Sequence, residues 1–348
     1  MERVPLPHDS RHRLARRIFR GALAFTATLT AFWIYVVVTR SDTAFFPYRP
    51  ITLEALGQVA AGVGIFHLLW GLIWYGVKNL LLARMVGFTP AERRAAFSSR
   101  LHAPFDVGAL TARYSERRIR IADMIGRRGR FATIALAGFF YFYLQVSADQ
   151  TPGFATLFLQ STLLDAVVTS WTFLALFGSD GRLAAMLYGS AARVMDGVLA
   201  RSNMLLISTL WTAFKFVMVP LGAWLAEVYP AHLFGVIFAL IWGSYIVTDA
   251  LAEIGGSLYG RQTLRVWGIG DVNRKSVGGT VTGFAGCLAL CLSLLWAHGL
   301  PPVWIALAVA IAVTNTSVEL YAPRGTDDFF MATANAVVCL IFGVAVLG

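Results

Sequence analysis

Residues 277–318 read VGGTVTGFAGCLALCLSLLWAHGLPPVWIALAVAIAVTNTSV, two apolar runs joined by the short turn HGLPP. Neither run contains Asp, Glu, Lys or Arg. A helix needs about 20 apolar residues, each adding a rise of about 1.5 Å, to cross the hydrocarbon core of a bilayer. The stretch therefore predicts two transmembrane helices, near 277–297 and 302–318, and an all-α membrane fold.

The same pattern recurs along the rest of the chain. Of its 348 residues, 57% are hydrophobic and 14% are charged, which excludes an ordinary soluble domain. Further apolar runs predict membrane helices near 21–39, 56–77, 131–147, 154–178, 203–225, 233–253 and 329–347. Together these runs predict a polytopic helical bundle of about nine transmembrane helices.

The charge distribution orients this predicted bundle. The formal net charge is +10, but the arginines flank apolar runs instead of forming a basic domain interleaved with aromatics. The positive-inside rule explains that pattern, so we expect a cytoplasmic N-terminus and no nucleic-acid partner. The first apolar run is long and lacks a small-residue cleavage site, which favours a retained helix over a signal peptide. The Arg-rich, Ala-rich composition without eukaryotic sorting signals favours a bacterial inner membrane.

No internal repeat or long low-complexity linker divides the chain. We expect a basic cytoplasmic N-terminus (1–20), N-terminal membrane helices (21–230) and a C-terminal membrane region (231–348). The basic connection 87–130 is expected to be cytoplasmic, either as a solvated link or as a helix on the anionic membrane surface. Residues 184–200 predict an amphipathic interfacial helix. The three cysteines fall inside apolar runs and are expected to serve packing.

Two acids interrupt the run at the end of 233–253. Asp249 and Glu253 are four residues apart, so on a helix they share a face one turn apart. Like charges repel there unless a cation intervenes, and Mg²⁺ binds one or two carboxylates together with substrate phosphates. The pair therefore predicts a magnesium site at the cytoplasmic end of a helix. The alternative is that both acids are solvated beyond the helix end.

A glycine-rich and basic segment follows the acid pair. Glycines permit close backbone approach, and a basic pair before a helix N-terminus favours anion binding. The candidate anion contacts are Gly256, Gly260, Arg274, Lys275, Ser276 and Gly279. The spacing is not that of a Walker motif, and the glycines alone also suit helix packing.

A second polar cluster, ELYAPRGTDD, spans residues 319–328. Pro323 and Gly325 predict a turn between two spans. The acids and the single arginine suit a second set of metal or phosphate contacts. A charge-neutral surface loop is the alternative.

The segments DALAEIGGSLYG, RKSVGGTVTG and VELYAPRGTDD resemble, in order, the motifs of the CTP-dependent polyprenol kinases. That group includes dolichol kinase, phytol kinase and CTP-dependent diacylglycerol kinase, and a wider grouping includes phosphatidate cytidylyltransferase. The resemblance covers 231–348 and is carried by three motifs separated by apolar runs. It implies an integral-membrane lipid kinase that uses Mg²⁺ and transfers a phosphoryl group from CTP to a polyprenol, phytol or diacylglycerol.

The resemblance also implies roles for individual residues. It implies catalytic roles for Asp249, Glu253, Lys275 and Asp327. Metal ligands would be Asp249, Glu253, Asp327 and Asp328. Nucleotide contacts would be Gly256, Gly260, Arg274, Lys275, Ser276, Gly279, Arg324 and Gly325, with Glu319 and Pro323 completing the last motif. The chain departs from the family pattern at Thr248, where Gly is usual, at Gly278, near where an acid is common, and at Asp328, where Asn is usual.

Two other functions compete with the lipid kinase. Transfer of CMP to phosphatidic acid would use a similar cradle, but the long C-terminal signature of the cytidylyltransferases is not seen. A transporter or non-catalytic membrane protein is the other class, because Asp165 and Lys215 are ionisable groups within predicted spans. No inverted repeat supports transport.

Overall fold

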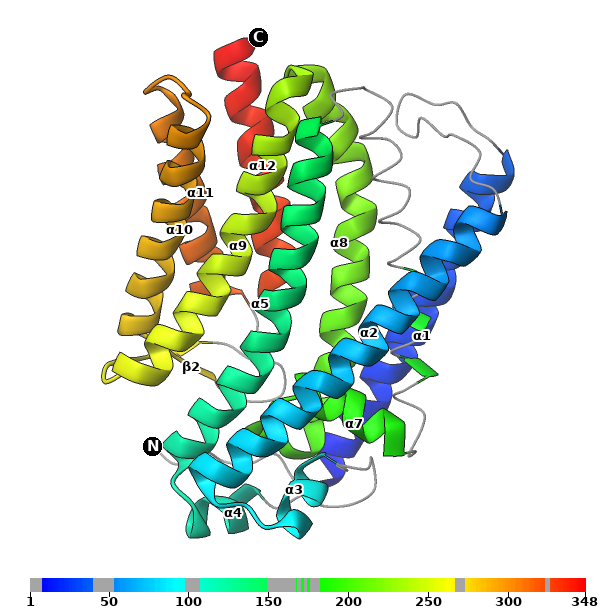
Figure 1. Ribbon diagram of the computed structural model, residues 1–348, viewed down its shortest axis with the longest axis vertical. Coiled ribbons are helices and arrows are strands. Elements are labelled where there is room, and N and C mark those ends of the chain that lie inside the picture. Colours follow the sequence, from blue (N-terminus) through cyan, green and yellow to red (C-terminus); the bar gives the residue numbers. More distant parts are fainter. Residues whose placement is uncertain are drawn as a thin grey trace. The chain divides into compact units, whose positions relative to one another are not determined.

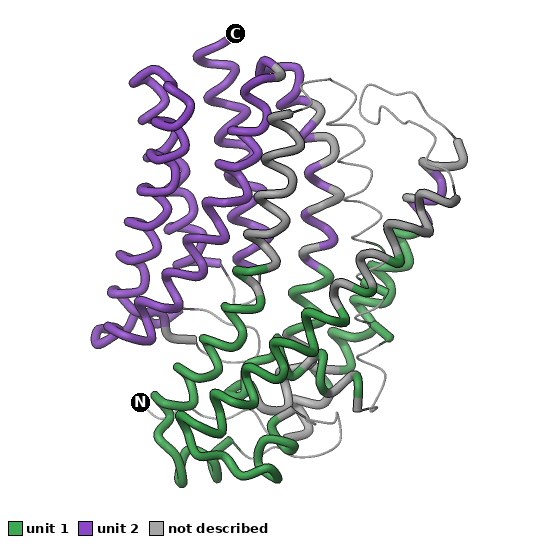
Figure 2. Tube along the Cα trace, viewed as in Figure 1, with its two compact units in different colours: residues 1–30, 54–134, 167–209 green, residues 31–53, 135–166, 210–348 purple. Residues whose placement is uncertain are grey.

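The computed structural model is dominated by helices (Figure 1). It describes residues 8–39, 53–97, 107–148, 182–266, 273–322 and 326–348, together with 167, 170, 171, 174 and 175. Figure 2 shows two compact units. Unit 1 comprises 1–30, 54–134 and 167–209, and unit 2 comprises 31–53, 135–166 and 210–348.

Unit 1 combines long helices with several short ones. The long helices that begin in or contribute to it are α1 (His8–Thr39), α2 (Leu53–Leu81) and α5 (Glu116–Ala148). The short elements are the π-helix η1 (Leu82–Val86), α3 (Pro90–Phe97), α4 (Val107–Arg113), α7 (Arg182–Ala191) and the 3₁₀-helix η2 (Val194–Leu199).

A hydrophobic cluster holds the short elements of unit 1 together. Its buried members are Leu82, Val86, Phe88, Leu110, Ile119, Ala122 and Val194. η1 ends at Gly87, whose φ of 90° is in the left-handed region that glycine adopts at least cost. Beyond it, Thr89 and Glu92 form a capping box: Thr89 N donates to Glu92 Oε2 (2.8 Å), and Glu92 N donates to Thr89 Oγ1 (3.2 Å).

Unit 2 contains the C-terminal helices. They are α9 (Ala231–Tyr259), α10 (Val277–Ala297), α11 (Trp304–Tyr321) and α12 (Asp327–Leu347), with α8 (Ala200–Val228) contributing its C-terminal part. α9 packs against α10, α11 and α12, and these four lie side by side in Figure 1. An antiparallel hairpin of β1 (Thr263–Val266) and β2 (Asn273–Ser276) joins α9 to α10.

The membrane prediction is confirmed in its coarse form. Among the described residues, four helices are long and apolar enough to cross a bilayer: 232–259, 277–297, 304–321 and 327–347. By length and apolar composition, these helices are typical of a helical membrane protein. The count of about nine spans and the cytoplasmic N-terminus stay predictions, and the expected span 154–178 lies almost entirely outside the described residues, as does Asp165.

Three local features differ from the expectation. The connection after α9, expected as a short polar segment, contains a β-hairpin within a fold that is otherwise all-α as predicted. The expected helix 184–200 is two elements, α7 and η2, separated at Ala192–Arg193. The basic part of the 87–130 connection is not separate from the next apolar run, because α5 continues through both from Glu116 to Ala148.

Candidate metal site

Three carboxylates from three helices meet in unit 2. One oxygen each of Asp249 (α9), Glu319 (α11) and Asp327 (α12) can be chosen so that all lie within 4.8 Å of one another. Asp249 and Glu319 are buried, with exposed fractions of 7% and 9%, and Asp327 is half-buried. Like charges held so close in a poorly hydrated place are stabilised by a bound cation or by protonation of one carboxylate.

Lys275 provides part of the positive charge. Its Nζ lies 2.8 Å from Glu319 Oε1 and 3.8 Å from Asp327 Oδ2. The lysine stands in β2, where it pairs with Leu264 of β1, and α10 begins two residues later at Val277. The hairpin thus brings an ammonium to the acids of three other segments. Among the described residues, Lys275 thus forms ion pairs with two of the three acids.

The second carboxylate oxygen of Glu319 is a further reason to expect a bound cation. Glu319 Oε2 is buried and accepts no hydrogen bond from any described residue. A buried carboxylate oxygen without a donor costs free energy, about 1–3 kcal/mol or more. Carboxylate oxygens are the ligands that Mg²⁺ prefers. The residues present therefore fit a divalent cation held by Asp249, Glu319 and Asp327.

This acid group differs from the one expected from the sequence. Glu253 and Asp328 were predicted as metal ligands, but neither belongs to the group of three among the described residues. Glu319 does belong to the group, although the resemblance gave it only a place in the last motif and did not name it as a metal ligand. Glu253 is half-buried on α9. Asp328 follows Asp327 in the first turn of α12, where the helix dipole stabilises a negative charge.

Ser276 has a defined role at the start of α10. It is the N-cap of the helix, with extended backbone, and its Oγ accepts a hydrogen bond from Gly279 N at 3.0 Å. The cap fixes the position of Lys275 one residue earlier. Arg274 lies in β2 with its Cα opposite that of Arg265. Pro323, Arg324 and Gly325 lie outside the described residues.

The predicted nucleotide-binding glycines lie where α9 and α10 touch. A Cβ on Gly279 would stand 2.5 Å from Ala252 O and 3.2 Å from the Cα of Gly256. A Cβ on Gly260 would stand 2.9 Å from the side chain of Ser276. These glycines let the two helices approach closely. Their contact with a nucleotide stays a prediction.

A buried polar layer lies beneath the acids. Asn315 and Asn335 each donate through Nδ2 to Ser244 Oγ, at 3.1 and 3.0 Å, and Asn315 Nδ2 also approaches Cys287 Sγ at 3.4 Å. All four side chains are 0% exposed, and each comes from a different helix of α9–α12. The layer ties the helices that carry the acids. Sequence reasoning missed it, although Asn315 precedes Glu319 by one turn on a polar face of an otherwise apolar helix.

Comparison with known proteins gives no family for this chain. No protein-family model matches it, and neither a curated protein nor a solved structure shows significant similarity to it.

Proposed function

We propose that the protein is an integral-membrane phosphotransferase that moves a phosphoryl group from a nucleoside triphosphate to the hydroxyl of a lipid alcohol. The observation that supports this most directly is the meeting of Asp249, Glu319 and Asp327 from three apolar helices with Lys275 of the hairpin. The resemblance of the three motifs to polyprenol kinases supplies the donor, CTP, and the substrate class.

The reaction needs positioning and charge neutralisation more than covalent help from the protein. The hydroxyl oxygen of the lipid attacks the γ-phosphorus, the bond from that phosphorus to the bridging oxygen of the nucleotide breaks, and the hydroxyl proton passes to a carboxylate of the cluster. The products are a lipid phosphate and a nucleoside diphosphate. A bound Mg²⁺ would supply neutralisation of the phosphate charge.

The chain's own residues divide the remaining work. Asp249, Glu319 and Asp327 would hold the cation, and Lys275 would offset charge on the phosphates. The buried layer of Ser244, Asn315 and Asn335 keeps α9, α11 and α12 in register, so the three acids stay together. A lipid alcohol reaches the site from the bilayer with its hydroxyl at the interface.

The test uses the full chain in proteoliposomes with CTP labelled at either the α or the γ phosphate. Label in the lipid from the γ position is expected. Label from the α position with release of pyrophosphate would instead establish CMP transfer to phosphatidic acid. No label from either position, with nucleotide-independent solute flux, would establish a transporter.

Variants connect the activity to the cluster. Asp249→Asn and Glu319→Gln each remove a proposed ligand and are expected to lower the rate by about a hundredfold or more. Glu227→Gln, an exposed acid at the end of α8, is the matched control. Glu253→Gln separates the two ligand sets, because a loss as large as that of Glu319→Gln would return Glu253 to the metal site.

A further inference from the structure

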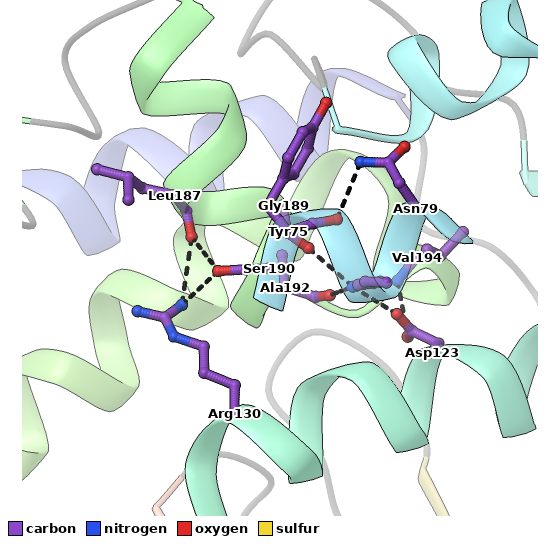
Figure 3. Close-up of polar contacts among 10 residues, drawn as sticks. Tyr75, Asn79, Asp123, Arg130, Leu187, Gly189, Ser190, Ala192 and Val194 are labelled. Carbon is purple, nitrogen blue, oxygen red and sulfur yellow. Dashed lines mark hydrogen bonds and ion pairs between the residues drawn. The ribbon is translucent and has the colours of Figure 1, made fainter. Parts of the chain in front are cut away.

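A buried guanidinium in unit 1 has neutral hydrogen-bond partners among the described residues. Arg130 of α5 is 8% exposed, and its Nη1 donates to Leu187 O (3.2 Å) and to Ser190 Oγ (2.7 Å). No carboxylate of the described residues forms an ion pair with it. Figure 3 shows both acceptors on one side of the guanidinium. Arginine carries five N–H donors, so Arg130 keeps several donors and its full charge for another partner.

The neighbouring charges do not compensate Arg130. Lys78 Nζ lies 2.6 Å from Asp123 Oδ1 and also donates to the carbonyl oxygens of Gly189 (2.9 Å) and Ala192. Asp123 Oδ2 accepts a hydrogen bond from Val194 N at 3.0 Å. The acid is therefore paired with Lys78 and with the Val194 amide at the start of η2; Figure 3 shows Asp123 beside Val194. This network also holds α7 and η2 against α2 and α5, so it fixes the place of Arg130.

Aromatic residues next to Arg130 are typical of a bilayer interface. Trp70 of α2 donates through Nε1 to Thr133 Oγ1 (3.1 Å), one turn beyond Arg130. The ring of Trp74 packs on Gly129, where a Cβ would stand 2.2 Å from it. Trp74 Nε1 is buried and has no acceptor among the described residues. Trp and Arg concentrate at the depth of the lipid phosphates, and Arg130 immediately precedes the predicted span 131–147.

A phosphate would satisfy the remaining N–H donors and the charge of Arg130. Burying an uncompensated charge costs several kcal/mol in general, whereas an arginine and a phosphate form short, often bidentate, charge-assisted hydrogen bonds. We propose that Arg130, positioned by Leu187 and Ser190 and flanked by Trp74, binds the phosphate of an anionic phospholipid at the membrane interface. This lipid is a bound structural partner, and the inference does not depend on the proposed phosphotransferase activity.

The test measures lipid binding by the full chain in nanodiscs. Phosphatidylglycerol is titrated into a phosphatidylcholine background, and retained lipid is counted by native mass spectrometry. Arg130→Gln is expected to weaken phosphatidylglycerol binding about fivefold or more, the effect of one interfacial cation. Trp74→Phe keeps an aromatic ring, though a smaller one, but loses the indole N–H, and is expected to weaken binding less. Arg118→Gln, which removes an exposed arginine from the same helix, is the matched control.

Two outcomes would overturn the proposal. One is equal loss, or no loss, in Arg130→Gln and Arg118→Gln, since surface charge alone would then explain binding. The other is displacement of the lipid by inorganic phosphate at comparable concentration, because the site would then take a free anion. Arg130→Lys covers the case in which Arg130→Gln does not fold. It retains the charge without the planar fork, and binding as tight as that of the unmodified chain would contradict the guanidinium–phosphate contact.

Discussion

Lys275 stands between two acids, 2.8 Å from Glu319 and 3.8 Å from Asp327. Its ammonium reduces the repulsion among three carboxylates, but it also competes with any divalent cation for the same oxygens. In the presence of a nucleotide the same charge would be available to the phosphates. One residue thus affects both the affinity for the cation and the transfer step.

Lys275→Met is expected to separate these two effects. Without the ammonium, the carboxylates attract a divalent cation more strongly, so Mn²⁺ should bind several-fold more tightly, as a change of about 1 kcal/mol implies. Phosphoryl transfer should fall at the same time. Mn²⁺ titration followed by electron paramagnetic resonance measures the first effect. Unchanged Mn²⁺ affinity would contradict this prediction. It would show that the lysine side chain moves away from the acids without a free-energy cost when the cation binds.

Glu92 gives a pH dependence that can be measured outside the membrane helices. Hydrogen bonds from the Thr89 amide and then from the Tyr114 hydroxyl lower the pKa of Glu92 below its usual 4.5. A lowered pKa contributes stability above the unfolded-state value, and this contribution is lost as pH falls through the folded-state value. Protection of the α3 amides from hydrogen exchange should therefore decline in acid. The decline should be smaller in Glu92→Gln, which cannot titrate.

At the scale of elements, the close contact between α9 and α10 depends on glycines, which have no side chain to separate the two helices. Gly279→Ala places a methyl group 2.5 Å from Ala252 O, which belongs to the backbone and cannot rotate away. The helices must separate, at a cost of roughly 1–3 kcal/mol. Thermal unfolding in detergent should show a lower midpoint. Gly76→Ala is the control, since nothing lies within 4 Å of its new methyl group and Ala favours a helix more than Gly does, so its midpoint should not fall; a comparable loss there would contradict the packing explanation.

The layer of Ser244, Asn315 and Asn335 predicts a second loss of stability. Ser244→Ala removes the one oxygen that accepts from both asparagines through Nδ2. Two buried donors then lose a partner, and we expect a destabilisation of about 1–2 kcal/mol, within the range found for polar contacts between membrane helices. Equilibrium unfolding in mixed micelles measures it. Ser293→Ala is a suitable comparison because that hydroxyl is exposed and bonds only within its own helix.

The sequence predicted elements well where hydrophobicity alone determines them. The run 277–297 became α10 with the same bounds, because a span in lipid is set by its apolar length. The β-hairpin could not be predicted, since TLRV and NRKS are too short and too polar for a period to appear. Glu319 could not be preferred to Glu253 as a metal ligand. That choice depends on which acids converge from separate helices, and the spacing of residues within one helix does not give this information.

At the scale of the whole molecule, cation binding should couple to stability. A ligand that binds only the folded state stabilises it by RT ln(1 + [L]/Kd), or about 2.7 kcal/mol at a concentration of 100 Kd. Mg²⁺ should therefore raise the unfolding midpoint of the unmodified chain, and a chelator should reverse the increase. The shift should be absent in Asp249→Asn. A shift of the same size in that variant would place the cation elsewhere.

The turn between α10 and α11 has a consequence for biogenesis. His298–Pro302 closes it around Gly299, whose φ is 60°, and the turn carries no Asp, Glu, Lys or Arg. The ionisable residues of the acid site lie at the opposite ends of α10 and α11. With the acid site on the cytoplasmic side, as the charge distribution predicts, insertion of this helical pair translocates only a loop without Asp, Glu, Lys or Arg, while each acid or lysine carried through the bilayer centre would cost about 2.5–3.5 kcal/mol. The pair can thus enter the membrane as a hairpin before any partner helix is present to neutralise it.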